Sequence, residues 1–379
     1  MRDLRDVEAE AFRRCLDTPA RASTLPPAAY TDAELYEREQ RLVFRQGWVG
    51  VGRADRWTNT GDYATFEIGG VPVVVVRADN GLRAHANTCR HRASMIVSGE
   101  GNCTRMRCPF HAWTYSLDGR LVGAPDMHRT PGFDKEEHGL VPFRVEQRHG
   151  FVFVSVDPDP PSIDDWFADF DPIHAPWPIS ELVMTHRREF TVDCNWKAFA
   201  EVFNEYYHLP YVHPGSIDDM YNDPDEPEEV KGAFATQFGT TTGSAAILGD
   251  DEEQALPLIP ELSGREARGV RYTWLYPNIV TAVGVDCMWM YEVYPDGPGR
   301  CRVARVVAFP PDTVAAPDFE AKVGEYYRRF DVAINEDIPV LEQQQRGLRS
   351  PFAEQARFSW LEPSVAAFAR WYADRMLAV

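Results

Sequence analysis

Two short pairs of cysteine and histidine constrain the fold of this chain more than any other feature of its sequence. Cys89 and His91 enclose one residue, Cys108 and His111 enclose two, and sixteen residues separate the pairs. Thiolates bind soft or borderline metals, and imidazoles suit zinc and iron. Four such ligands, grouped two and two, predict a metal centre held between two loops.

The composition of each pair indicates which metal centre this is. A structural zinc site groups cysteine with cysteine and histidine with histidine, whereas a Rieske [2Fe–2S] cluster is held by two cysteines on one iron and two histidines on the other. Here each loop offers one ligand of each kind, so each loop can reach both irons. The spacing favours the cluster over structural zinc or a chance arrangement. Trp113 is a candidate to shield the cluster.

The residues around the two pairs are typical of short strands joined by tight turns. Gly69-Gly70 and Asp118-Gly119 are hairpin signals, and the flanking runs are rich in β-branched and aromatic residues. We expect strands at 62–68, 71–78 and 82–87, a hairpin at 114–123, and a closing strand at 149–156. The sequence therefore predicts a small all-β domain over residues 43–157. Cys103, between the two loops, is expected to be a structural or free thiol.

A second group of possible metal ligands lies in residues 195–217. The segment opens as an amphipathic helix, and Glu201, Glu205 and His208 share one of its faces. His213 follows His208 by five residues, which places it about 140° away on a regular helix. Pro210 should break the helix between the two histidines. Both imidazoles could then turn to one point.

Two histidines need a third ligand to form the facial triad of a non-haem Fe(II) site. Residues 328–350 predict a long helix that carries Glu336, Asp337 and Glu342. Acidic residues on a helix usually face solvent, so the pattern alone does not separate a ligand from a solvated face.

Length and charge limit the remaining possibilities. The 379 residues are too many for one compact core and suit two domains. A formal net charge of -19 argues against nucleic acid as the general partner. The chain has no apolar run long enough for a bilayer and no signal peptide, so we expect a cytoplasmic protein without a membrane partner. The seven cysteines suggest free thiols and metal ligands rather than disulfides.

Taken in order, the motifs resemble the oxygenase α-subunits of Rieske non-haem iron oxygenases over nearly the whole chain. CRH, CPFHAW and LDGRL match the cluster domain, NWKAFAE…EYYHLPYVHP matches the mononuclear iron motif, and EDIPVLEQQQRGL matches the segment with the last carboxylate. The resemblance implies that Cys89, His91, Cys108 and His111 hold the cluster, and that His208, His213 and Asp337 hold Fe(II). It places Glu205 where the family has an acidic residue bridging the iron to a neighbouring subunit's cluster.

The resemblance also implies an α+β fold and an assembly. We expect a small all-β Rieske domain at 43–157 and a catalytic domain at 158–379. The catalytic domain should be a helix-grip fold, an antiparallel sheet around a long helix. Residues 1–42 should form a helical segment that packs on it. The family implies a head-to-tail homotrimer, O₂ as co-substrate, and NAD(P)H electrons delivered through a separate reductase or ferredoxin. Arg90, Arg92, Arg105 and Arg107 are candidates for that docking surface, or solvated loop charges.

Within the family, this chain is similar to the branch that acts on quaternary ammonium compounds, such as the carnitine, glycine betaine and proline betaine monooxygenases. Glu205 replaces the more common Asp, and the sequence around YTWLYPN is also similar. Aromatic faces hold a trimethylammonium group best, through cation–π attraction. Candidate pocket residues are Phe203, Trp274, Tyr276, Trp289 and Tyr291, and Tyr272 alternates with two of them. The same residues could instead form the core of a curled sheet.

These observations predict the terminal component of an oxygenase system. The reaction expected first is monooxygenation of a small quaternary ammonium compound, by hydroxylation or N-demethylation. A ring-hydroxylating mono- or dioxygenase of aromatic substrates remains an alternative. An electron carrier fused to a ligand-binding domain is a third, and the second metal site argues against it.

Overall fold

The computed structural model describes residues 4–18 and 20–378. The chain divides into two compact units, which we call the cluster unit (residues 43–161) and the helix-grip unit (residues 1–42 and 162–379). The division at 161 lies four residues beyond the expected boundary at 157. Of the predicted N-terminal segment, residues 1–3 and 19 lie outside the described residues.

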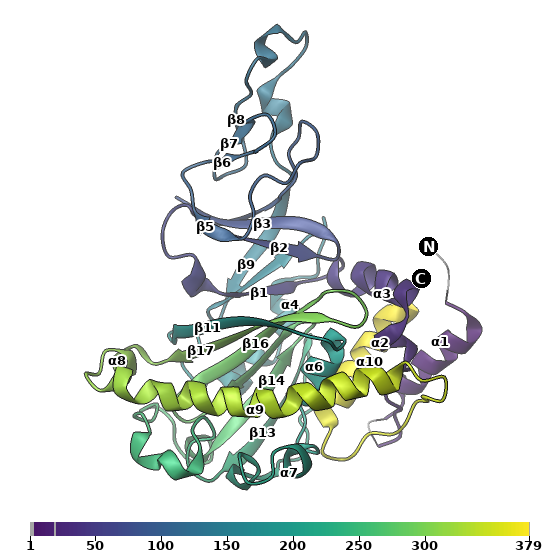
Figure 1. The fold of residues 1–379 in the computed structure, drawn as a ribbon, viewed down its shortest axis with the longest axis vertical. Coiled ribbons are helices and arrows are strands. Elements are labelled where there is room, and N and C mark those ends of the chain that lie inside the picture. Colours follow the sequence, from purple (N-terminus) through teal and green to yellow (C-terminus); the bar gives the residue numbers. More distant parts are fainter. Residues whose placement is uncertain (1–3, 19, 379) are drawn as a thin grey trace. The chain divides into compact units, whose positions relative to one another are not determined.

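The cluster unit is built of antiparallel strands (Figure 1). Gly69 and Gly70 both have positive φ, 57° and 76°, in the tight turn between the second and third strands, as a type I′ hairpin turn requires. The main sheet has the order β1-β10-β9-β4-β3-β2-β5, and a second sheet has the order β6-β7-β8. The strands are β1 (Val49–Arg53), β2 (Asp62–Ile68), β3 (Val71–Ala78), β4 (Gly81–Ala86), β5 (Glu100–Asn102), β6 (Met106–Arg107), β7 (Thr114–Tyr115), β8 (Leu121–Gly123), β9 (Pro142–Arg148) and β10 (Phe151–Ser155).

The helix-grip unit has one seven-stranded antiparallel sheet, in the order β11-β17-β16-β15-β14-β13-β12. Its central strands β15 and β16 are buried except for Pro295 at the end of β16, because helices cover the sheet. The strands are β11 (Val183–Val192), β12 (Tyr221–Pro224), β13 (Phe234–Thr241), β14 (Gly269–Leu275), β15 (Ile279–Val283), β16 (Met288–Pro295) and β17 (Cys301–Phe309). An antiparallel sheet with a long helix across it confirms the predicted α+β helix-grip architecture.

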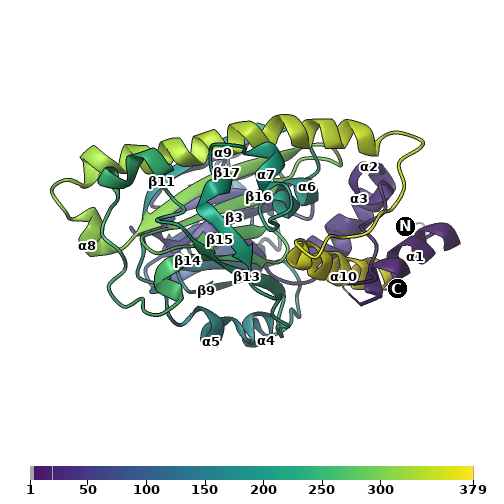
Figure 2. The same ribbon diagram turned by 90° about the horizontal axis from the view of Figure 1, so that it is seen from below.

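The long helix α9 (Phe319–Leu348) lies across one face of this sheet (Figures 1 and 2). Val323, Tyr326, Phe330 and Ile334 recur at helical spacing and are buried against it. The other helices are α1 (Asp6–Arg13), α2 (Ala28–Thr31), α3 (Ala33–Glu39), α4 (Ile163–Phe167), α5 (Phe170–His174), α6 (Trp196–Val202), α7 (Leu209–Val212), α8 (Pro311–Val314) and α10 (Pro363–Leu377). Within the described residues, no helix combines the length and apolarity needed to cross a bilayer.

A buried polar cluster joins the N-terminal segment to α6 and α10. The Glu39 carboxylate forms an ion pair with Lys197, and both side chains are fully buried. Glu39 also accepts hydrogen bonds from Trp196 Nε1 at 2.8 Å and from the Tyr372 hydroxyl at 2.7 Å. Buried charges stabilise a fold only when they are paired and hydrogen-bonded in this way. This buried polar cluster therefore anchors residues 33–39 against α6 and α10.

Candidate metal centres and the adjoining cavity

The two cluster loops have the same backbone turn. The N–H of Ala93 donates to the carbonyl of Cys89 at 3.0 Å, and the N–H of Ala112 donates to the carbonyl of Cys108 at 3.1 Å. Ala93 and Ala112 have φ of 59° and 58°, a conformation that residues with a Cβ rarely adopt. Matching turns let the loops present their cysteine and histidine side chains to a shared site.

The four side chains separate into a buried thiol pair and a more exposed imidazole pair. Cys89 and Cys108 are both buried in the same hydrophobic core. The rings of His91 and His111 lie 4.7 Å apart and closer to solvent. No three of the four ligand atoms lie within 4.8 Å of one another, whereas a single zinc ion gathers all its ligands at 2.0 to 2.3 Å. The arrangement suits a two-iron cluster with thiolates on one iron and imidazoles on the other.

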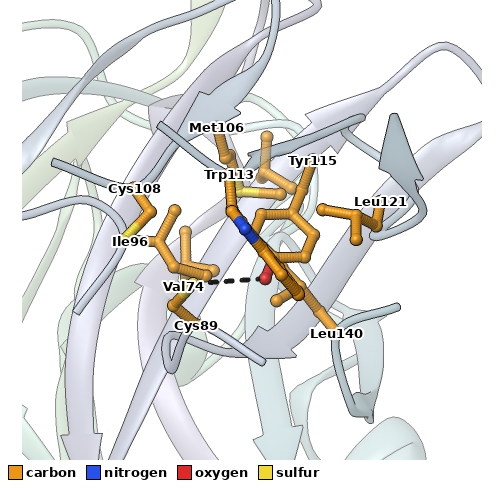
Figure 3. Packing of buried hydrophobic residues seen from close by; sticks show 10 residues of the cluster. Val74, Cys89, Ile96, Met106, Cys108, Trp113, Tyr115, Leu121 and Leu140 are labelled. Carbon is orange, nitrogen blue, oxygen red and sulfur yellow. Dashed lines mark hydrogen bonds between the residues drawn. The ribbon is translucent and has the colours of Figure 1, made fainter. Parts of the chain in front are cut away.

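Two aromatic residues, Trp113 and Tyr115, pack in the same hydrophobic core as the two cysteines (Figure 3). Trp113, expected to shield the cluster, stacks on His91 with a centroid distance of 4.9 Å. The Tyr115 hydroxyl accepts the N–H of Arg90 at 3.0 Å and lies 3.3 Å from Cys89 Sγ. A thiolate that binds metal can only accept, so in the metal-bound state the Tyr115 hydroxyl would donate to Cys89 Sγ. The sequence prediction did not include Tyr115.

The second centre brings His208, His213 and Asp337 together within the helix-grip unit. One ligand atom from each lies within 4.8 Å of the others. Asp337 Oδ1 is 3.0 Å from His213 Nε2 and 3.7 Å from His208 Nε2. Among the three carboxylates that the long helix offered, the geometry selects Asp337. Two imidazoles and one carboxylate on one side of a cavity form the facial triad of non-haem Fe(II) sites.

Both imidazoles are oriented by a second carboxylate. His208 Nδ1 lies 2.5 Å from Glu205 Oε1, and His213 Nδ1 lies 2.8 Å from Glu336 Oε2. A proton on each Nδ1 leaves each Nε2 lone pair free for a metal, and such carboxylates commonly orient metal-bound histidines. Asp337 Oδ1 is buried with no hydrogen-bond donor, as expected of an oxygen that binds a cation. The donor set therefore fits a ferrous ion.

The backbone around the histidines differs from the predicted one. The expected helix break at Pro210 is wrong, because α6 already ends at Val202 and Pro210 lies in the first turn of α7. His208 and His213 flank that four-residue helix at its two ends. Glu205 accepts the N–H groups of Tyr207 and His208, immediately before α7. Glu205 thus holds both the backbone and the ring of His208.

A small cavity of about 50 Å³ adjoins the triad. Phe203 meets Tyr272 at 5.3 Å and 67°, and Tyr291 at 5.1 Å and 79°. Three aromatic rings at steep angles therefore form adjacent walls. The complete lining is Phe199, Val202, Phe203, Glu205, His208, Leu209, His213, Ile217, Tyr272, Trp289, Tyr291, Arg329, Ala333, Ile334 and Asp337.

Trp274 and Tyr276, which the sequence suggested for the pocket, lie elsewhere. Trp274 shares its cross-strand row with Tyr291, but α10 covers this part of the sheet. The Trp274 ring stacks on Phe368 at 3.8 Å, and the Tyr276 ring lies 4.7 Å from Trp371. Residues on one face of a sheet meet different partners according to the helix above them. Tyr272, one pleat away, lines the cavity instead.

Arg329 is a charged cavity residue that the sequence prediction did not include. It lies eight residues before Asp337 on α9 and is buried. A basic residue two turns from a predicted metal ligand was the available signal. This signal was weak, because an arginine on a charged helix usually faces solvent.

Comparison with known families agrees with both centres. Residues 47–134 match the "Rieske [2Fe-2S] domain" family. Residues 179–378, more than half of the chain, match the "Ring hydroxylating alpha subunit (catalytic domain)" family. The first match contains all four cluster ligands, and the second contains the two histidines and the aspartate of the triad.

Individual proteins are similar over most of their length. The glycine betaine monooxygenase oxygenase subunit of Chromohalobacter salexigens is 29% identical, over 94% of this chain and 86% of that protein. The chloroplastic choline monooxygenase of Arabidopsis thaliana is 31% identical, over 92% of this chain and 82% of that protein. A crystal structure of a quaternary ammonium Rieske monooxygenase is 25% identical, covers 99% of both chains and has a TM-score of 0.80. The chain therefore belongs to the Rieske oxygenases, as an oxygenase α-subunit.

Proposed function

We propose that this protein is a monooxygenase that removes a methyl group from a small quaternary ammonium compound. The observation that carries this proposal is the cavity beside the triad, where Phe203, Tyr272 and Tyr291 form adjacent aromatic walls. A trimethylammonium group cannot accept or donate a conventional hydrogen bond, and aromatic faces attract it through cation–π interaction. The similarity to glycine betaine and choline monooxygenases supports the same substrate class.

The proposed reaction balances with one molecule of O₂ and two electrons. One oxygen atom enters a C–H bond of an N-methyl group, and the other leaves as water with two protons. The N-hydroxymethyl product then breaks its C–N bond and releases formaldehyde, a proton and the demethylated amine. The two electrons come from NAD(P)H through a separate reductase.

The residues have distinct roles in this proposal. Cys89, His91, Cys108 and His111 would hold the Rieske cluster, and His208, His213 and Asp337 would hold the iron. The cluster supplies electrons one at a time, and a ferrous ion with three protein ligands has open positions to bind and activate O₂. Glu205 and Glu336 keep the two imidazoles in the tautomer that binds metal. The aromatic walls place the N-methyl group and exclude water.

We further propose that electrons reach the iron from the cluster of a neighbouring subunit in a homotrimer, with Glu205 as the bridge. Glu205 lies at His208 on the iron side. Large aromatic side chains are exposed close to it along the chain, with Tyr207 50% and Tyr211 75% exposed. Trp360, 70% exposed, belongs to the same surface because Tyr206 N–H donates to the Leu361 carbonyl. Such a patch supports a protein interface.

The reductase or ferredoxin is proposed to dock at the cluster loops. Arg90, Arg92, Arg105 and Arg107 are all exposed there, in a chain of net charge -19. Arg105 and Arg107 also line a shallow groove. A local basic patch on an acidic protein can steer an acidic electron donor.

A single-turnover assay tests the proposed reaction. Iron-loaded protein is reduced, the reductant is removed, and O₂ is admitted with glycine betaine, carnitine, choline or a simple aromatic acid. Formaldehyde and hydroxylated products are measured together. Formaldehyde formed from an ammonium compound, in proportion to cluster oxidation, is expected. Ring hydroxylation without formaldehyde would contradict the proposal and favour an aromatic substrate.

Two substitutions of Glu205 separate its bridging role from its support of His208. Glu205→Gln keeps an oxygen that can accept the His208 Nδ1 proton, so iron content should stay close to wild type. Glu205→Ala removes that oxygen, and we expect about 10- to 100-fold weaker iron binding. If Glu205 bridges the centres, reoxidation of the cluster by O₂ should be slow in the iron-loaded Gln variant as well. Wild-type reoxidation in that variant would contradict the bridge.

A further inference from the structure

The cavity contains a buried positive charge that the proposed chemistry does not use. Arg329 is only 3% exposed and lines the cavity. Its Nη2 donates to the Tyr221 hydroxyl at 2.8 Å, whereas its buried Nε has no partner. Among the side chains that the structure describes, which do not include those of residues 250–252, no carboxylate forms an ion pair with it. Its guanidinium also lies over the rings of Phe330 and Trp289, at 5.3 and 5.5 Å.

The Tyr221 and Tyr272 hydroxyls beside Arg329 include one hydrogen without an acceptor. The Tyr221 and Tyr272 hydroxyls are 2.6 Å apart, and one hydrogen bond between them uses one of their two hydrogens. The Tyr221 oxygen already accepts from Arg329, and no further acceptor for the second hydrogen is found in the described chain. A hydroxyl and a guanidinium are both donors in this arrangement. This part of the site is therefore rich in donors and poor in acceptors.

These observations restrict the charge of the ligand. A buried cation without a counter-ion is strongly unfavourable, and a buried donor without a partner costs free energy as well. A ligand that is only a cation would bring a second positive charge into the same cavity. A ligand that also carries an anionic group would neutralise Arg329. It would also accept hydrogen bonds from Arg329 Nε and from the tyrosine hydroxyl that has no acceptor.

We propose that Arg329 binds a carboxylate of the substrate, so that the substrate is a zwitterion with a quaternary ammonium group at one end and a carboxylate at the other. This inference rests on the proposed N-demethylation and specifies its substrate class. Arg329, Ala333, Ile334 and Asp337 all line the cavity from α9. Arg329 and Asp337 are eight residues apart, about 12 Å along the helix axis. The carboxylate binds at the Arg329 end, and the N-methyl group faces the triad.

Matched substrates test the inference on the iron- and cluster-loaded enzyme. Glycine betaine and choline both carry a trimethylammonium group, but only betaine has a carboxylate. The methyl ester of betaine keeps its shape and removes the negative charge. We expect the wild-type enzyme to favour betaine over both by about 10- to 100-fold in kcat/KM for formaldehyde release, the range of a charge-assisted hydrogen bond. Calorimetric titration of the anaerobic enzyme should give the same order of affinities.

Substitution of Arg329 should change the preference and not merely the rate. Arg329→Gln should lose most of the preference for betaine, with the affinity for choline unchanged or higher. Arg329→Lys should retain part of the preference. Arg305→Gln is the matched control, because Arg305 is also buried and contacts Phe330, but pairs with Asp331 and does not line the cavity. Arg305→Gln should lower kcat/KM for betaine and choline by the same factor or leave both unchanged.

Two outcomes would overturn the inference, and they are distinguishable. Demethylation of betaine and choline with equal efficiency, and a ratio unaffected by Arg329→Gln, would leave N-demethylation standing and remove the carboxylate site. Absence of formaldehyde from every ammonium compound, with turnover of an aromatic acid, would overturn the proposed function and the zwitterionic substrate together.

Discussion

The hydroxyl of Tyr115 is a single group with a predictable effect on the cluster. It lies 3.3 Å from Cys89 Sγ, and hydrogen bonds to the sulfur atoms of a cluster raise its reduction potential because they stabilise the reduced state. A net contribution of about 1 kcal/mol for one hydrogen bond corresponds to about 40 mV for one electron. Tyr115→Phe should therefore lower the potential by roughly this amount.

Potentiometric titration of the cluster absorbance measures the effect. Tyr63 packs against the same core, and Tyr63→Phe should leave the potential near that of wild type. An unchanged potential in Tyr115→Phe, with the cluster fully loaded, would contradict the assigned hydrogen bond.

Glu201 predicts a specific dependence of stability on pH. It is half-buried and accepts a hydrogen bond from the Tyr30 hydroxyl at 2.6 Å, and desolvation of its carboxylate raises its pKa from 4.5 to about 7. Between these values the folded protein keeps a proton that the unfolded chain has released, so rising pH favours unfolding. Glu201 should make the free energy of unfolding fall by up to roughly 3 kcal/mol between pH 4.5 and pH 7.

Thermal denaturation of wild type and Glu201→Gln over this pH range checks the prediction. The variant still accepts the Tyr30 hydrogen bond but cannot ionise, so its advantage over wild type should grow as the pH rises. Glu320→Gln, on the exposed side of α9, should follow wild type. Parallel curves for wild type and Glu201→Gln would show that Glu201 does not titrate in this range.

At the scale of elements, α9 is both a wall of the cavity and the carrier of a metal ligand. Ala333 lies between Arg329 and Asp337 and lines the cavity. Ala333→Leu should fill part of the cavity and weaken substrate binding by about 10- to 100-fold, consistent with the 1–3 kcal/mol cost of overpacking. Iron content should be unchanged, because the ligand side chains are not altered.

Substrate affinity and iron content, measured on the same preparation, separate these two properties of the helix. Ala321→Leu is the control, since Ala321 is exposed on α9 and outside the cavity lining. Loss of iron in Ala333→Leu would indicate that the substitution displaces the helix instead of filling the cavity.

For the whole molecule, the proposed homotrimer predicts complementation between inactive subunits. Cys89→Ser should disable the cluster and leave the iron site, while Asp337→Ala should disable the iron site and leave the cluster. If electrons pass between subunits, trimers reassembled from both variants should recover activity that neither variant has alone. Formaldehyde release after mixing and reassembly is the measurement. Hybrids with no activity, although they form, would contradict electron transfer between subunits.

Much of the fold was accessible from the sequence because its signals are local. The strands at 62–68 and 71–78 agree with β2 and β3, and the predicted long helix is found in α9. Short-range periodicity and turn residues determine such elements. The position of the helix break was wrong, because α6 ends at Val202 and Pro210 lies in the first turn of a new helix, where its missing N–H is tolerated.

The two cysteine–histidine pairs and the two histidines of the triad could be proposed as ligands from the sequence because the members of each pair lie within a few residues of each other. Asp337, far from the histidines in sequence, could be proposed only from the family resemblance. The surroundings of the ligands were decided only by the tertiary structure. Glu336 contacts His213 although 123 positions separate them in the sequence, and Tyr115 contacts Cys89 over a separation of 26. Trp274 packs against α10 and does not line the cavity. The burial of Arg329 was likewise not predictable from the sequence. A charged residue on a helix is ordinarily solvated, and only the packing of α9 over the sheet makes this one a buried cation without a counter-ion.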